Sequence, residues 1–140
     1  MAVVDASVVV DWVAPRVDPS EPAARLLQRF ATSSEHLVAP RLLLQETANA
    51  LLTGVRRGRW SGAEADASFA TLSQMPVRLV DPDEALQRAW DLSRRYDEHP
   101  LYDMVYLAVA QSVGDTLYTA DAALVARLGL DTAAAVVLVA

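Results

Sequence analysis

The feature that most constrains the fold is the alternation of short apolar segments with longer segments of helical periodicity. The apolar runs cover residues 3–4, 37–39, 77–80, 116–119 and 136–139. Strands that alternate with helices are typical of an α/β domain, and interior parallel strands consist of continuous apolar residues. We therefore predict a single α/β domain over residues 1–140, with a central parallel sheet of about five strands flanked by helices.

Local signals place several helix boundaries. Ser61 precedes Glu64 by three residues, which is the spacing of a capping box. Asp81 and Glu84 repeat that spacing, so a helix is expected to begin after Asp81. Gly114 is placed to end a helix that starts near Leu101 and has apolar residues at helical spacing.

The composition excludes several kinds of chemistry. The chain has no cysteine and no lysine, so zinc–thiolate sites, thiol nucleophiles and lysine-dependent mechanisms are absent. His36 and His99 are the only histidines, too few for a three-histidine zinc site, and neither lies in a recognisable catalytic motif. The net charge of −6 argues against nucleic-acid binding by bulk electrostatics. Any nucleic acid would be held by local arginines and by metal.

The beginning of the chain leads directly into an apolar strand, without the basic segment of a secretory signal. No apolar run approaches the length of a membrane span. We therefore expect a cytoplasmic protein that does not associate with a membrane.

Three aspartates occupy the positions where α/β proteins bind ligands or where helices begin. Asp5 directly follows the first predicted strand, and Asp121 follows the fourth by one residue. Ligands bind beyond the carboxyl ends of parallel strands, so both carboxylates reach one edge if these strands are neighbours. Asp103 lies in the first turn of a helix. Taken singly, each aspartate also fits a structural role as a helix cap or a first-turn acid.

Glu46 does not fit that structural account. It lies in the middle of a predicted helix, one turn after Leu42 and Leu43 and one turn before Ala50, on the apolar side. An unpaired carboxylate there would be costly or would take up a proton, so it needs a cation. The alternatives are an arginine from elsewhere in the fold, or a rim position where the carboxylate reaches water.

If these acids converge, they repel one another. At about 4 Å each pair costs roughly 1 kcal/mol in water and about 4 kcal/mol at an effective dielectric of about 20. A divalent cation would remove that repulsion, and oxygen-only ligands suit Mg²⁺ or Mn²⁺. Such a site supports hydrolysis of phosphodiesters. The spacing permits convergence and does not require it.

The same residues resemble a known pattern. Val-Val-Asp5-Ala-Ser7, Glu46 on the helix after Pro40, Tyr102-Asp103 at the start of a helix, and the segment 117–121 (Leu-Tyr-Thr-Ala-Asp) are similar in order and spacing to PIN domains. The chain length and motif order resemble those of VapC toxins of VapBC toxin–antitoxin systems. The resemblance covers essentially the whole chain.

The resemblance implies a metal-dependent endoribonuclease. The implied ligands of Mg²⁺ or Mn²⁺ are Asp5, Glu46, Asp103 and Asp121. A metal-bound water would attack an RNA phosphodiester, and Ser7 and Thr119 would orient carboxylates or water. The substrate would be tRNA, rRNA or mRNA. The protein would form a homodimer and would be silenced by a small antitoxin inserted into its active-site groove. Met104 departs from the pattern, where a smaller residue is common, and this affects a pocket wall rather than a ligand.

Two further features are open to two interpretations each. The run 56–60 (Arg-Arg-Gly-Arg-Trp) could hold RNA phosphates and stack a base, or it could be a solvated helix end. His99 lies shortly before Asp103, so it could lie near the site, but we predict a surface loop histidine there.

Two other functions remain as alternatives. One is a catalytically silent PIN-fold module that binds RNA or protein. The other is a phosphatase of another α/β family, such as the haloacid dehalogenases, which also place an aspartate after the first strand. Those enzymes need a second aspartate two residues further on, where Ser7 stands, and a later lysine, which this chain lacks.

Overall fold

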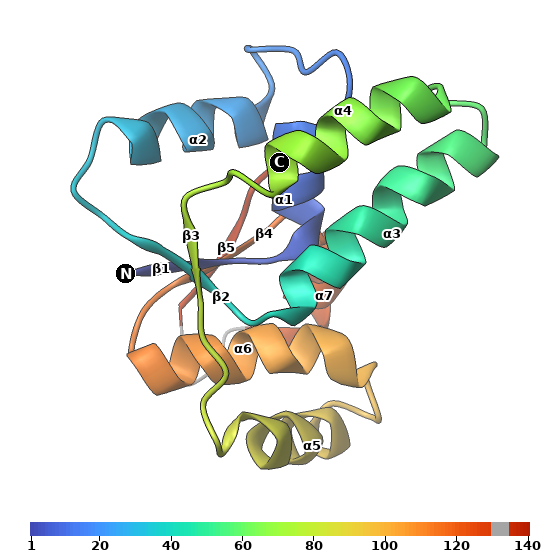
Figure 1. Cartoon of the computed structure of the whole chain (residues 1–140). Coiled ribbons are helices and arrows are strands. Elements are labelled where there is room, and N and C mark those ends of the chain that lie inside the picture. Colours follow the sequence, from blue (N-terminus) through green and yellow to red (C-terminus); the bar gives the residue numbers. More distant parts are fainter. Residues whose placement is uncertain (130–134) are drawn as a thin grey trace.

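The computed structural model of the chain describes residues 1–129 and 135–140 (Figure 1). Within these ranges the chain forms five strands and seven helices. The strands are β1 (Ala2–Val4), β2 (Leu37–Ala39), β3 (Val77–Leu79), β4 (Leu117–Thr119) and β5 (Val136–Leu138). The helices are α1 (Ala6–Val13), α2 (Pro22–Ala31), α3 (Leu42–Arg56), α4 (Gly62–Leu72), α5 (Ala85–Arg95), α6 (Leu101–Val113) and α7 (Ala122–Leu128).

The strands form one sheet in the order β3-β2-β1-β4-β5, and every neighbouring pair is parallel. The predicted α/β fold with a parallel sheet of five strands is therefore confirmed. The central strand is β1, where Val3 aligns with Val38 on one side and with Leu117 on the other. Because β1 and β4 are neighbours, the residues that follow them lie at the same edge of the sheet.

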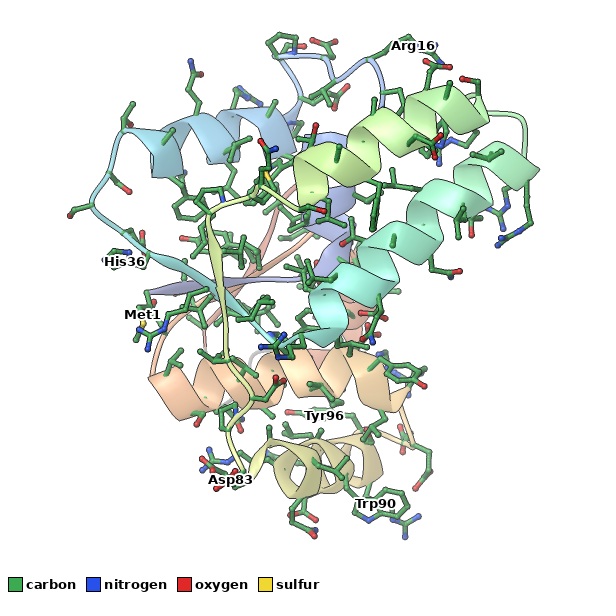
Figure 2. The ribbon with its side chains drawn as sticks, in the orientation of Figure 1. Met1, Arg16, His36, Asp83, Trp90 and Tyr96 are labelled. Carbon is green, nitrogen blue, oxygen red and sulfur yellow. The ribbon has the colours of Figure 1, made fainter. Side chains whose placement is uncertain are left out.

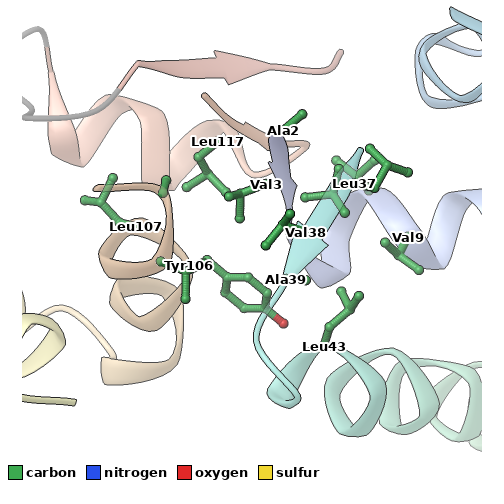
Figure 3. Packing of buried hydrophobic residues seen from close by; sticks show 14 of the residues in the cluster. Ala2, Val3, Val9, Leu37, Val38, Ala39, Leu43, Tyr106, Leu107 and Leu117 are labelled. Carbon is green, nitrogen blue, oxygen red and sulfur yellow. The ribbon is translucent and has the colours of Figure 1, made fainter. Parts of the chain in front are cut away.

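Helices cover both faces of the sheet (Figure 1). On one face α6 packs against β1 and β4, and α5 packs on the outside of α6. On the other face α1 contacts β4 and is surrounded by α2, α3 and α4. Val3, Val38 and Leu117 of the sheet have no exposed surface and pack with Tyr106 and Leu107 of α6 (Figure 3). None of the helices in the described ranges has the length and apolar character needed to cross a membrane.

Two of the predicted helix boundaries are confirmed. The capping box is present, with the Ser61 hydroxyl accepting from the Glu64 backbone N–H at 3.1 Å and the Glu64 carboxylate accepting from the Ser61 N–H at 3.0 Å. Gly114 ends α6 with a φ of 68°, a left-handed conformation that glycine adopts without a steric penalty. These boundaries depend on neighbouring residues only, which is why local sequence indicates them.

The predicted cap at Asp81 is wrong. The helix α5 begins after Glu84, and neither residue forms the expected reciprocal cap. Asp81 instead accepts a hydrogen bond from the Arg41 backbone N–H at 3.4 Å, and its carboxylate lies 3.6 Å from the Arg41 Nε. Arg41 and Asp81 each follow one of the adjacent strands β2 and β3, so the sheet brings together a pair that are far apart in the sequence.

Candidate active site

Asp5 is held in a turn at the carboxyl end of the central strand. It is the N-cap of α1, and its carboxylate accepts from the Val8 backbone N–H at 3.4 Å and from the Ser7 hydroxyl at 2.5 Å. Only 5% of the residue is exposed. Asp5 therefore has the capping role that its sequence position suggested, but a cap is normally solvent-exposed, and this one is buried.

Two hydroxyl groups join the turn after β1 to the turn after β4. The Ser7 hydroxyl lies 3.3 Å from the Thr119 hydroxyl and accepts from the Ala120 backbone N–H at 2.8 Å. The Thr119 hydroxyl in turn accepts from the Asp121 backbone N–H at 3.1 Å. Thr119 is fully buried. The two predicted hydroxyl residues are thus brought together beside Asp5, in positions where they fix the geometry of both turns.

Burial is the main cause that raises the pKa of the Asp5 carboxyl to about 6. Hydrogen bonds from Ser7, from Thr119 and from the backbone of Val8 act in the opposite direction and lower it. The charge of Asp103 raises it further. The fold thus holds an acid where its charged form is disfavoured, and a second acid from α6 adds to that effect.

Glu46 points from α3 toward α6. It is partly buried, and it accepts a hydrogen bond from the Tyr106 hydroxyl at 2.7 Å. Burial raises the pKa of Glu46, the Tyr106 hydrogen bond lowers it, and the charge of Asp103 raises it. Figure 3 shows the Tyr106 hydroxyl directed from α6 toward the first turn of α3, where Leu43 lies. Its partner is therefore a tyrosine rather than an arginine, and part of the residue remains exposed.

Asp103 occupies the first turn of α6, with 31% of its side chain exposed. One of its carboxylate oxygens lies 2.7 Å from Nε2 of His99, whose side chain is 12% exposed. The prediction that His99 is a surface loop histidine is therefore wrong. The four-residue spacing to Asp103 was the only sequence signal of this contact.

Asp121 is the N-cap of α7, and its carboxylate accepts from the Leu124 backbone N–H at 3.1 Å. Asp121 therefore has the structural role of a helix cap. Its backbone is joined to Thr119, but Asp103 rather than Asp121 is the acid whose charge raises the pKa of Asp5 and Glu46. The fold thus places Asp121 at the carboxyl edge of the sheet, with its side chain engaged as a cap.

The chemistry of the donor set fits a hard divalent cation. All donors are carboxylate oxygens, and in residues 1–129 and 135–140 none of them forms an ion pair with an arginine. In the same ranges no three acidic or histidine side chains are grouped closely enough to be a preformed metal site. Asp103 contacts His99 and Glu46 contacts Tyr106, so each acid has its own partner within the protein. The acids affect one another through their charges.

Trp60 and Trp12 are both buried and have structural roles. Trp60 is only 9% exposed and donates from Nε1 to the Leu51 carbonyl at 2.9 Å, so the interpretation of this residue as a base-stacking platform is wrong. Trp12 is 6% exposed and donates from Nε1 to the Ala23 carbonyl at 2.6 Å. Arg59 lies over the Trp60 ring, with its guanidinium carbon 4.8 Å from the ring centroid.

The parallel sheet, with acids at its carboxyl edge, defines an α/β protein of the kind that binds ligands beyond the ends of its strands. The chain belongs to the PIN domain family, which matches residues 2–129. Its fold is similar to the crystal structure of VapC20 from Mycobacterium tuberculosis, a toxin that cleaves the sarcin–ricin loop, with a TM-score of 0.66. That likeness covers 90% of this chain and 94% of the other at 22% sequence identity. A search among curated proteins finds no match.

Proposed function

We propose that this protein is a metal-dependent endoribonuclease that acts as the toxin of a toxin–antitoxin pair. The observation that carries the proposal is that the fold of a PIN domain family member places the buried Asp5, at the end of β1, beside Ser7 and Thr119 at the end of the neighbouring strand β4. Asp103 on α6 lies near enough that its charge adds a small contribution to the raised pKa of Asp5 and of Glu46 on α3. A cluster of this kind is stabilised by a bound cation or by retained protons.

Asp5, Glu46 and Asp103 would hold Mg²⁺ or Mn²⁺, because hard cations prefer oxygen ligands. When bound, such an ion lowers the pKa of a water and offsets charge on a phosphate. The hydrogen bonds from Ser7 orient Asp5, and Thr119 supports Ser7 from β4. Asp121 would complete the set directly or through water.

A surface hollow reaches the turn after β4 and is a candidate path for the RNA strand. It has a volume of about 470 Å³ and includes Ala120, whose N–H donates to Ser7, but none of the four acids lines it. Arg16 and Arg59 line it, together with acidic side chains such as Asp11. Arg16 is paired with Glu64 at 2.7 Å and Arg59 lies over the Trp60 ring, so these arginines would contact individual phosphates only by exchanging partners and form no basic surface.

The partners follow from the family resemblance. We propose a cytoplasmic homodimer that is silenced by a small antitoxin. Exposed apolar side chains on two adjacent helices, Leu52 of α3 at 56% and Phe69 of α4 at 54%, support a contact between copies of the chain. Because the similar VapC20 structure is of a toxin that cleaves the sarcin–ricin loop, ribosomal RNA is the first substrate to test, followed by tRNA and mRNA.

The direct test is RNA cleavage by the purified protein with Mn²⁺, with Mg²⁺ and with EDTA. Cleavage is expected only with metal, and Asp5→Asn and Asp103→Asn should abolish it while the protein stays folded. Asp66→Asn, an exposed aspartate on α4, is the matched control and should retain full activity. Cleavage that survives EDTA and both site variants would refute the metal mechanism. RNA binding without any cleavage would instead identify a silent binding module.

The toxin role has a separate test in cells. Expression of the active protein should arrest growth, and co-expression of a short neighbouring gene should restore it. The Asp103→Asn variant should be harmless at the same expression level. Normal growth of cells that contain the active wild-type protein would contradict the toxin role without affecting the nuclease proposal.

A further inference from the structure

The contact between His99 and Asp103 is a feature of this site to which no sequence motif assigned a role. The imidazole Nε2 lies 2.7 Å from Oδ2 of Asp103, and only 12% of the His99 side chain is exposed. A carboxylate can only accept, so Nε2 carries the proton in this contact and donates it. The hydrogen bond occupies one oxygen of Asp103 and restricts rotation of its carboxyl group.

The backbone before His99 is strained. Asp97 and Glu98 both have a φ of 56°, in the left-handed region that side chains other than glycine rarely adopt. This conformation is strained for residues other than glycine, and it persists only where surrounding contacts impose it. These two consecutive residues lead directly into the imidazole that contacts Asp103.

Contacts from two helices hold this strained turn. Arg94 of α5 pairs with Glu98 at 2.7 Å, and Arg127 of α7 lies 3.5 Å from the Asp97 carboxylate. The His99 backbone N–H donates to the Tyr96 carbonyl at 3.2 Å. The turn between α5 and α6 is therefore contacted by α5 and by α7 through solvent-exposed ion pairs, and it leads directly into the imidazole.

The other two coupled acids are held in a comparable way. Ser7 donates to Asp5, and Tyr106 donates to Glu46. Each acid thus has a hydrogen-bond donor from the protein, which leaves its other lone pairs available to a ligand. Donors of this kind orient metal-binding carboxylates, and their loss typically weakens metal binding by about 10- to 100-fold.

We propose that His99 is a positioning residue that acts through Asp103, and that the strained turn at Asp97 and Glu98 exists to hold the imidazole in place. This inference rests on the proposed metal site. The imidazole donates from Nε2 to Asp103 and fixes which carboxylate oxygen faces Asp5 and Glu46. It does not itself contact the RNA or the metal.

The test compares His99→Leu with His99→Gln, because the glutamine amide can donate from a nitrogen at a similar reach. Mn²⁺ binding to the metal-free protein is measured by calorimetric titration. We expect His99→Leu to weaken binding by roughly 10-fold or more and His99→Gln to stay within about threefold of the wild type. His36→Leu is the matched control, because His36 is exposed and lies beside Met1, at the edge opposite to the turn between α5 and α6 (Figures 1 and 2).

A double variant shows whether His99 acts through Asp103. In an Asp103→Ala background, which removes both oxygens that could accept from His99, the further change of His99→Leu should weaken the remaining Mn²⁺ binding by less than about twofold. An equal loss in both backgrounds would overturn the proposal, because it would show a general structural role. Binding by His99→Leu within about twofold of the wild type would also overturn it.

The imidazole ¹⁵N spectrum of the metal-free protein separates this proposal from the metal site. The His99 ring should show a single Nε2–H tautomer, and Asp103→Asn should perturb that signal. If the wild type shows the tautomer but binds no Mn²⁺, the metal site and the positioning role are both overturned and the contact is structural only. If the wild type binds Mn²⁺ and His99→Leu binds it equally well, the positioning role alone fails.

Discussion

Replacing Asp5 by asparagine removes a buried charge while keeping the size and shape of the side chain. The folded protein raises the pKa of Asp5 from its ordinary value of 3.8 to about 6, mainly because only 5% of the residue is exposed. A shift of about two units corresponds to roughly 3 kcal/mol. The deep burial leaves little solvent screening to reduce this figure, although the new amide N–H₂ group needs acceptors and will reduce the gain.

The sign of the effect follows from proton linkage. A carboxyl whose pKa is raised by folding binds its proton more tightly in the folded than in the unfolded state. The metal-free wild type should therefore lose stability as the pH rises from about 4 to about 6, and should change little above that for this group. Asp5→Asn should lack this loss, so at pH 8 its free energy of unfolding should exceed that of the wild type by about 1–3 kcal/mol.

Urea unfolding in EDTA at pH 4 and pH 8, followed by the fluorescence of the buried Trp12 and Trp60, measures this difference. Asp66→Asn, which replaces an exposed aspartate, is the control and should change the free energy of unfolding by the same amount at pH 4 and at pH 8. Adding Mn²⁺ should stabilise the wild type more than Asp5→Asn, because only a ligand bound to the folded state contributes. An Asp5→Asn variant no more stable than the wild type at pH 8 would refute the assignment of Asp5 as a buried, unfavourable charge.

Two further substitutions test the scaffold of the site. Gly54→Ala places a Cβ 2.1 Å from the Trp60 ring and should destabilise the protein by about 1–3 kcal/mol in urea unfolding, whereas Gly62→Ala meets no atom within 4 Å and should not. Thr119→Val removes the hydroxyl that accepts from the Asp121 N–H, and in the wild type this hydroxyl also lowers the pKa of Asp5. The substitution should therefore reduce the free energy of unfolding by about 1–2 kcal/mol and move the pH dependence of stability to higher pH. Thr119→Ser, which keeps the hydroxyl, should retain the wild-type pH dependence, and an identical profile for Val and Ser would contradict this role.

The elements of the fold could be predicted because their causes are local. Continuous apolar runs predict interior parallel strands, and the pair Ser61 and Glu64 predicts a helix start, because each signal depends on residues that are neighbours in the chain. The same reasoning failed at Asp81, where the partner is Arg41 on the neighbouring strand end. A local spacing rule cannot detect a competing partner forty residues away.

The sequence also predicts the chemical type of the proposed site and the order of its residues. The absence of cysteine and lysine, together with acids after the first and fourth strands, favours oxygen ligands and a hard cation. Glu46 is conspicuous because an acid on an apolar helix side needs a partner. The sequence could not show that its partner is Tyr106, because the contact joins residues 60 positions apart and exists only where α6 packs near the start of α3.

The sequence by itself therefore determined the order of the elements, the identity of the acids and the family to which they point. The tertiary structure decided which strands are neighbours, and so placed Ser7 beside Thr119 at one edge of the sheet. It also decided that His99 turns toward Asp103 instead of solvent. The physical reason is that pKa shifts and hydrogen-bond partners depend on distance and burial in space, which the folded packing sets and residue spacing does not.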